Sequence, residues 1–299
     1  MEKTKRIKVF ACGKIPSSIV ERIAVITNHF EDYVRINNYS SSRYYLNSVL
    51  KPLEEKKALV KCIGLYEKHE KSKLEKLGQA LEGLDTAIIL ANLRDENSFK
   101  NIEIISKIAR EKGVLVIVMA LIPYSTDKNE QLKYDTEIQC LASKVDTFIP
   151  LLAEKIALDS NIPLVDKDGI DFCESYMEFC LEQLVDFFGE GLVNIKKEDF
   201  NEIFKDSGLG FIAIGAGEGK DKLEKALKLG SINNSKVSKS KKLLVGILGN
   251  QDMDLTYINN ILERIQAISR EKCNVVFGAF RYDELKDGLI ITIIGIENS

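Results

Sequence analysis

The first half of the chain alternates between two hydrophobic patterns. Short, continuous apolar runs are typical of buried strands, and stretches with an apolar residue every three or four positions are typical of helices. The predicted strands cover residues 7–12, 33–37, 59–63, 86–90, 114–119 and 147–152. The predicted helices cover residues 17–28, 72–81 and 102–112. Strand 114–119 is apolar at every position, which indicates a parallel α/β sheet covered on both faces.

A long helix is predicted over residues 168–188. Its apolar positions recur at helical spacing and form one buried stripe, made of Ile170, Cys173, Met177, Cys180, Leu184 and Phe187. Asp168 is placed as its N-cap, and Gly189 and Gly191 end it. We interpret this helix as a spine that joins two domains.

The last third predicts a compact α+β domain. Its strands cover residues 210–215, 243–249, 274–280 and 289–296, and its helices cover 220–228 and 255–269. A lysine- and serine-rich loop is expected over residues 231–242. The predicted division of the chain is therefore 1–166, 167–190 and 191–299.

Residues 91–100 carry the main functional signal, which is a lack of glycine. They lie between a buried strand and a helix, where many α/β proteins hold a phosphate with a glycine-rich loop. Here the segment has no glycine, and Asp95 and Glu96 place two carboxylates where phosphate oxygens would lie. The first half therefore indicates a nucleotide-binding scaffold without its nucleotide-binding chemistry.

Composition limits the other function classes. The 299 residues include 42 basic and 45 acidic side chains, so the net charge of −3 indicates no general attraction to nucleic acid. The six cysteines form no CxxC pair and the two histidines stand alone, so we expect buried free thiols and no metal site. No apolar stretch reaches transmembrane length, and we expect a cytoplasmic protein.

Three glycine-containing segments of the second half resemble the C-terminal domain of FtsZ, the bacterial relative of tubulin. These are GLGFIAIGAGEG at 208–219, LLVGILG at 243–249 and NVVFGAF at 274–280. Shorter matches follow the same order along the chain, and the resemblance covers residues 7–297. It implies a Rossmann-type parallel sheet, a central helix and a smaller α+β domain, with a cytoskeletal role in cell division.

The resemblance also implies that the GTP site is degenerate. The first glycine-rich loop of the family falls on residues 11–17, where only Gly13 remains and Pro16 lacks the N–H that a phosphate needs. The signature GGGTGTG falls on residues 94–100 with no identity. The family's base-contacting position falls near Glu174.

Other family positions are altered as well. The glycine-rich loop expected after Gly64 is missing, and the positions that hold the ribose and guanine side fall near Asp127 and Gln131.

The family's synergy loop, which reaches the GTP of a neighbouring subunit, is altered too. Asn194 and Asp199 match the family, but Lys196 replaces the first aspartate. Because a lysine ammonium cannot accept a proton from water, the resemblance implies that hydrolysis is damaged on both sides of the subunit contact.

Two interpretations of the 91–100 segment stay open. In one, Lys14, Arg94 and Lys100 hold a phosphate. Each of the two carboxylates would repel a phosphate charge 4 Å away by about 1 kcal/mol in water-like surroundings and by roughly 4 kcal/mol at intermediate dielectric. In the other, Arg94 and Lys100 pair with Asp95 and Glu96 and fill an empty cleft.

Two further patterns favour structural roles. Residues 215–220 approach a phosphate-loop spacing, but Asp221 stands where a Ser or Thr would hold magnesium, so we expect a turn that opens a helix. Asp252 and Asp254 resemble a catalytic pair, but Asp254 directly precedes a helix and is expected to be its N-cap.

The sequence leads to three functional hypotheses. The first is an FtsZ-like protein without GTP or another cofactor, acting by longitudinal contacts with itself or with a true FtsZ. The second is a slow or unconventional nucleotidase that still polymerises, and the third is nucleotide-independent filament assembly. Because the FtsZ tail that recruits membrane tethers is not seen before Ser299, we expect no direct membrane binding.

Overall fold

The computed structural model describes residues 6–27, 33–37, 61–64, 70–160, 167–228 and 235–296. The chain divides into two compact units. Unit 1 comprises Met1–Glu154 and Leu164–Glu178, and unit 2 comprises Lys155–Pro163 and Phe179–Ser299. The first two residues of the strand predicted at 59–63 lie outside the described residues.

The described part of unit 1 contains a parallel sheet. Its strands are β1 (Ile7–Cys12), β2 (Tyr33–Asn37), β3 (Lys61–Gly64), β4 (Thr86–Asn92), β5 (Leu115–Ile122) and β6 (Thr147–Leu152). They lie in the order β3-β2-β1-β4-β5-β6, and each neighbouring pair is parallel. This is the strand order of the doubly wound Rossmann fold, so the predicted fold class is confirmed.

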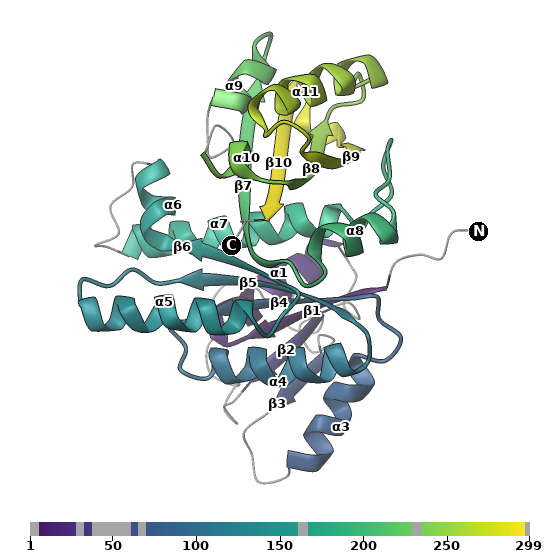
Figure 1. Cartoon of the computed structure of the whole chain (residues 1–299). Helices are drawn as coiled ribbons and strands as arrows, with labels where there is room; N and C mark the ends of the chain where they lie inside the picture. The colour runs from purple at the N-terminus through teal and green to yellow at the C-terminus, as the bar shows by residue number, and fades with distance from the viewer. Residues whose placement is uncertain are drawn as a thin grey trace. The chain divides into compact units, whose positions relative to one another are not determined.

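Helices cover both faces of this sheet. They are α1 (Lys14–Thr27), α3 (Glu70–Ala80), α4 (Ser98–Glu111), α5 (Lys128–Ala142) and the first residues of α6 (Ala153–Ser160). Strand β2 lies beyond β1 and β5 lies beyond β4, so right-handed crossovers place α1 and α4 on opposite faces. Figure 1 shows α4 and α5 in front of the strands. Every residue of β4 and β5 is accordingly buried.

Helix α7 (Lys167–Asp186) is the predicted long helix. Five residues of its apolar stripe are buried as expected, because Cys173, Met177, Cys180, Leu184 and the following Phe187 expose 2% or less of their surface. Ile170, the first residue of the predicted stripe, is only half-buried. The helix begins at Lys167, so Asp168 lies in its first turn, and the prediction of Asp168 as the N-cap was wrong.

Unit 2 contains a mixed sheet in the order β7-β10-β8-β9. Its strands are β7 (Gly208–Glu218), β8 (Lys242–Gly249), β9 (Asn274–Arg281) and β10 (Gly288–Ile296). Strand β10 is antiparallel to β7 and β8, whereas β8 and β9 are parallel and are joined through α11 (Leu255–Ile268). Helix α11 packs Ile258, Ile261 and Ile265 into the core, which confirms the α+β domain.

The remaining helices of unit 2 are short. They are α8 (Lys197–Phe204), α9 (Lys222–Lys228), α10 (Ser235–Lys239) and the 3-10 turn η3 (Asp283–Leu285). Helix α10 lies where the sequence predicted only a loop. Two contacts stabilise this helix. Val237 exposes only 1% of its surface, and Ser240 Oγ donates to the Lys236 carbonyl at 2.8 Å.

The glycine-rich segment 215–220 is mostly strand. Residues up to Glu218 continue β7, and Gly217 pairs with Leu289 of β10. A Cβ at Gly217 would lie 2.0 Å from the Lys222 carbonyl oxygen, so the glycine permits a close backbone approach. The expected turn is confined to residues 219–221, where Gly219 has φ of +82° and its carbonyl accepts the Lys222 N–H at 3.1 Å.

The aspartate pair near α11 is structural, as predicted. Asp254 is the N-cap of this helix, and its Oδ1 accepts the Tyr257 N–H at 2.7 Å. Asp252 Oδ2 accepts from Asn250 Nδ2 in the preceding turn.

Candidate functional site

The strand order of unit 1 defines where a ligand site is expected. The order reverses between β1 and β4, and open α/β sheets bind ligands outside the carboxyl ends of the strands at such a switch point. Here those ends carry Gly13 after β1, and Asn92, Arg94 and Asp95 at the end of β4.

The side-chain carboxylate of Asp95 lies beside Gly13 at this switch point. Gly13 has φ of +100°, and a Cβ placed on it would lie 2.6 Å from Asp95 Oδ2. Asp95 Oδ1 accepts the Asn97 N–H at 3.1 Å, and the Asp95 carbonyl accepts the Ser98 N–H at 2.9 Å. An anion approaching the Gly13 backbone would therefore meet a fixed negative charge.

Helix α4 begins at Ser98, four residues before the predicted start. Ser98 is fully buried, and its Oγ donates to the Cys12 carbonyl at 3.4 Å, which ties the helix start to β1. Burial, and then the charge of Asp95, raise the pKa of the Cys12 thiol far above its ordinary value. Cys12 is therefore a neutral packing residue.

Helix α1 also begins earlier than predicted, at Lys14. Pro16 consequently lies in the first turn of the helix, where a backbone N–H has no intrahelical partner to lose. The expected loop over residues 11–17 is replaced by the end of β1, Gly13 and this first turn.

Two cavities lie at the switch point. The larger, of about 290 Å³, is lined by Lys14, Ile15, Pro16, Asn92, Arg94, Asp95 and Glu96. The smaller, of about 120 Å³, is lined by Ile15, Asn92, Arg94, Leu121, Pro123, Tyr124, Ala153, Ile170, Cys173 and Glu174. The cavities thus bring together five of the predicted residues of the degenerate GTP site, Lys14, Arg94, Asp95, Glu96 and Glu174. Gly13, and Lys100 on α4, line neither cavity.

The expected pairing of cations and carboxylates in this segment was wrong. Within the described part of the chain, neither Arg94 nor Lys100 forms an ion pair with Asp95 or Glu96. Asp95 is held by backbone N–H groups instead.

Glu174 on α7 faces the smaller cavity together with Arg94. Burial, followed by the charge of Asp171, raises the pKa of this carboxyl above its ordinary value. Arg22, Arg94 and Lys14 act in the opposite direction, which shows that cations face Glu174 from several elements.

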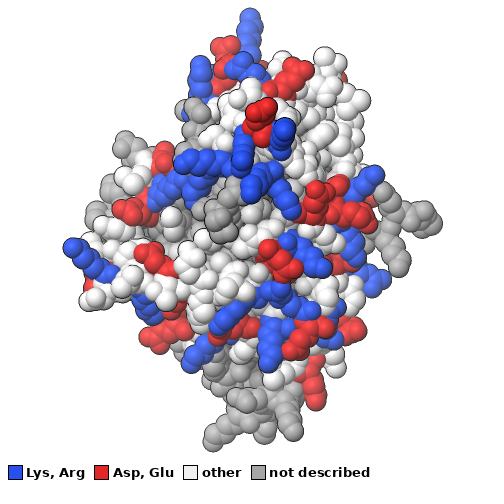
Figure 2. Space-filling view, viewed as in Figure 1, with Lys and Arg blue, Asp and Glu red and all other residues white. Residues whose placement is uncertain are grey.

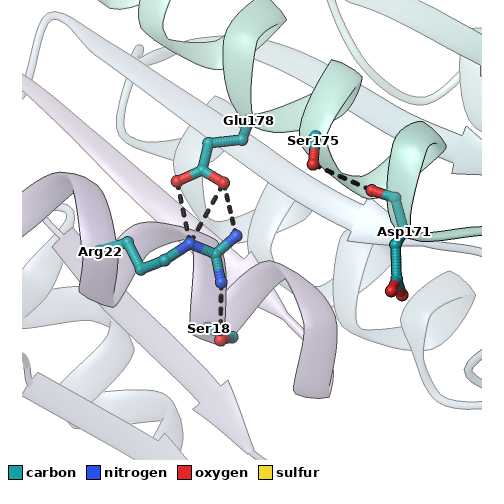
Figure 3. A network of polar contacts seen from close by, with 5 residues as sticks. All are labelled: Ser18, Arg22, Asp171, Ser175 and Glu178. Atoms are coloured by element: carbon teal, nitrogen blue, oxygen red, sulfur yellow. Dashed lines mark hydrogen bonds and ion pairs between the residues drawn. The ribbon is translucent and has the colours of Figure 1, made fainter. Parts of the chain in front are cut away.

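An ion pair that the sequence did not reveal joins α1 to the part of α7 that belongs to unit 1. Arg22 Nε donates to both Glu178 oxygens at 3.0 and 3.1 Å, and Nη2 donates to Oε2 at 2.5 Å. Figure 3 shows this forked contact, together with the Arg22 Nη1 bond to Ser18 Oγ and the Ser175 bond to the Asp171 carbonyl. The two partners are 156 residues apart in the sequence, so no local pattern predicts them.

Asn92 was also missed, because the predicted strand ended at Leu90. Its side chain exposes only 6% of its surface, and its Oδ1 accepts the Arg94 N–H at 3.0 Å. The available signal was a polar residue at the carboxyl end of an entirely apolar strand.

The synergy-loop residues lie in unit 2, before and within α8. Asn194 Oδ1 accepts the Gly191 N–H at 2.7 Å, and Asp199 Oδ2 accepts the Lys196 N–H at 3.0 Å. Both side chains that match the family therefore stabilise the loop, while the Lys196 residue is exposed.

The described residues contain no group of three or more His, Cys, Asp or Glu side chains arranged to hold a metal ion. They also contain no helix long and apolar enough to cross a bilayer. Figure 2 shows basic and acidic side chains interspersed over the face in view.

Comparison with known proteins agrees with this fold. Residues 208–297 match the family model described as FtsZ family, C-terminal domain. The cell division protein FtsZ of Aquifex aeolicus is 22% identical over 230 residues, which cover 75% of this chain but only 63% of that protein. FtsZ of Methanothermobacter thermautotrophicus is 23% identical over 303 residues, covering 97% of this chain and 78% of that protein.

Among solved structures, an empty FtsZ dimer from M. jannaschii superposes with a TM-score of 0.79 at 15% identity. The match covers 98% of this chain and 89% of that one. Together these findings show that this chain is similar to proteins of the FtsZ/tubulin superfamily. Within that superfamily, its C-terminal part matches the FtsZ family.

Proposed function

We propose that this chain is an FtsZ-like cytoskeletal protein of the cell-division type that acts through subunit contacts without binding or hydrolysing GTP. The observation that carries the proposal is the Asp95 carboxylate lying against Gly13 at the switch point. That position is where the fold offers its backbone N–H groups to a phosphate, and here the chain supplies the anion itself.

The charge of the site supports the same conclusion. A nucleoside triphosphate would bring its phosphate charge toward Asp95 and Glu96, which line the larger cavity without an ion-pair partner among the described residues. These charges support a site that holds no nucleotide.

The charges support contact between subunits that does not require this chain to bind a nucleotide itself. In the family resemblance, the loop that holds Lys196 meets the phosphate site of the next subunit. An exposed lysine on the loop complements either a phosphate of a competent FtsZ or, between two copies of this chain, the Asp95 and Glu96 carboxylates. The relative solved as an empty dimer is consistent with association between such subunits.

Nucleotide binding is tested by the melting temperature of the purified protein with GTP, GDP or ATP and magnesium. A ligand at one hundred times its dissociation constant stabilises a protein by about 2.7 kcal/mol, a shift of several degrees. We expect no shift at millimolar nucleotide, with FtsZ of Aquifex aeolicus as the positive control. A saturable rise with GTP would overturn the proposal.

Subunit contact is tested by sedimentation and light scattering without nucleotide. We expect concentration-dependent assembly of the chain, which Lys196→Glu weakens and the matched change Lys205→Glu at another exposed lysine leaves intact. Restoration of assembly by Glu96→Lys in the Lys196→Glu background would locate the contact. Should the chain stay monomeric, the remaining partner is a true FtsZ, and an unchanged GTPase rate and filament length in a mixture would reject the proposal.

One observation favours the nucleotidase alternative. Because Arg94 and Lys100 are not paired with the neighbouring carboxylates, their cations remain available to a phosphate. Measurable GTP or ATP turnover that Arg94→Ala abolishes would establish that alternative.

A further inference from the structure

The smaller cavity at the switch point has opposite charges on its wall. Arg94 at the end of β4 and Glu174 on α7 both line it. They influence each other electrostatically, yet no ion pair joins them in the described chain, so a space separates the two charges. Burial raises the pKa of the Glu174 carboxyl, and the charges of Arg22, Arg94 and Lys14 offset this only in part.

Asn92 adds an amide donor to the Arg94 side of this cavity. The residue exposes 6% of its surface, and its Oδ1 accepts the Arg94 N–H. Its Nδ2 is not among the buried atoms that lack a hydrogen-bond partner in the described chain. Because Asn92 lines the cavity, this amide can donate to an acceptor that an occupant brings.

The rest of the wall is apolar and the space is small. Ile15, Leu121, Pro123 and Ile170 contribute aliphatic surface. The cavity of about 120 Å³ is slightly smaller than one of about 150 Å³ that holds benzene, so its volume suits an occupant of the size of a small amino acid.

We propose that this cavity binds a small zwitterion, a free L-α-amino acid with a short aliphatic side chain. Its carboxylate lies toward Arg94 and the Asn92 amide, its ammonium lies toward Glu174, and its side chain contacts the aliphatic wall. The inference rests on the proposed function in one respect, because the cavity is open to a small ligand only when no nucleotide fills it.

The test measures binding to the full chain by saturation-transfer NMR and by melting temperature. The probes are L-alanine, L-valine and L-proline, with isovalerate and isobutylamine as analogues of valine that lack the ammonium or the carboxylate. We expect at least one amino acid to bind in the millimolar range or better. Each valine analogue should bind about tenfold more weakly than valine or not at all.

Variants locate the site. Glu174→Gln and Arg94→Ala are expected to weaken amino-acid binding by about tenfold or more. The matched controls Glu96→Gln and Lys100→Ala remove like charges that do not line this cavity, and they should leave binding unchanged. Because Gln has the shape of Glu and Arg94 is exposed, neither test variant removes core packing.

Three outcomes would overturn the inference. They are no binding of any of the three amino acids, binding that Glu174→Gln leaves intact, or equal binding of isovalerate and valine. A separate GTP titration keeps the two proposals distinguishable, since GTP binding contradicts the proposed function and the amino-acid result decides only this inference.

Discussion

The forked contact between Arg22 and Glu178 is expected to stabilise the attachment of α7 to α1. The Arg22 side chain is 46% exposed and the Glu178 side chain 19% exposed, so solvent screens the attraction. Exposed ion pairs contribute about 0.2–1 kcal/mol. Since three N–H···O contacts fix the geometry here, we expect a coupling energy near the top of that range, about 1 kcal/mol.

The assay is a double-mutant cycle of Arg22→Ala and Glu178→Ala, followed by urea unfolding with far-UV circular dichroism. The coupling is the part of the two destabilisations that is not additive. Ser18→Ala serves as the control, because it removes only the secondary acceptor of Arg22.

Salt separates an electrostatic contact from simple packing. The Debye length falls from about 10 Å at 0.1 M to about 3 Å at 1 M salt, so the coupling between Arg22 and Glu178 should decrease markedly at the higher concentration. A coupling below about 0.3 kcal/mol at low salt, or one that salt does not change, would refute this reasoning.

Three further predictions concern packing, protonation and capping. Gly246→Ala should destabilise unit 2 by about 1–3 kcal/mol or more in urea unfolding, because its Cβ would lie 1.9 Å from the buried Phe187 ring; wild-type stability would contradict this. Burial disfavours the charged form of Glu174, so the wild-type protein should lose stability as pH rises from the ordinary carboxyl pKa through the raised pKa of the folded state, and Glu174→Gln should remove this loss. Parallel melting profiles of the two proteins from pH 4 to pH 7 would count against this prediction. Asp254→Ala should lower thermal stability by about 1 kcal/mol, whereas Asp252→Ala, outside the helix cap, should change it less; the reverse order would reject the capping assignment.

The sequence predicted the central strands of unit 1 well because they are continuous apolar runs. Strand β6 matches its predicted bounds, and β4 and β5 are buried along their whole length as expected. The helix starts were less predictable. Helix α4 begins at Ser98 because that hydroxyl contacts the Cys12 carbonyl, a tertiary contact between residues 86 positions apart.

The candidate site was predicted in part. The residues chosen from the 91–100 segment do meet at the switch point, because the carboxyl ends of parallel strands share one sheet edge. The side-chain partners were not predictable: Asp95 turns to Gly13 rather than to Arg94, and Asn92 bonds to a backbone N–H. Such choices depend on short distances that residue spacing does not encode.

The carboxylate beside Gly13 has a consequence for control in time. A carboxylate that belongs to the chain cannot be exchanged, diluted or cleaved as a bound nucleotide can. Under the proposed function, the subunits would therefore not change state with time after they assemble, and the extent of assembly would depend on protein concentration alone. Synthesis and degradation, rather than a hydrolysis cycle, would then determine when the assembled state exists.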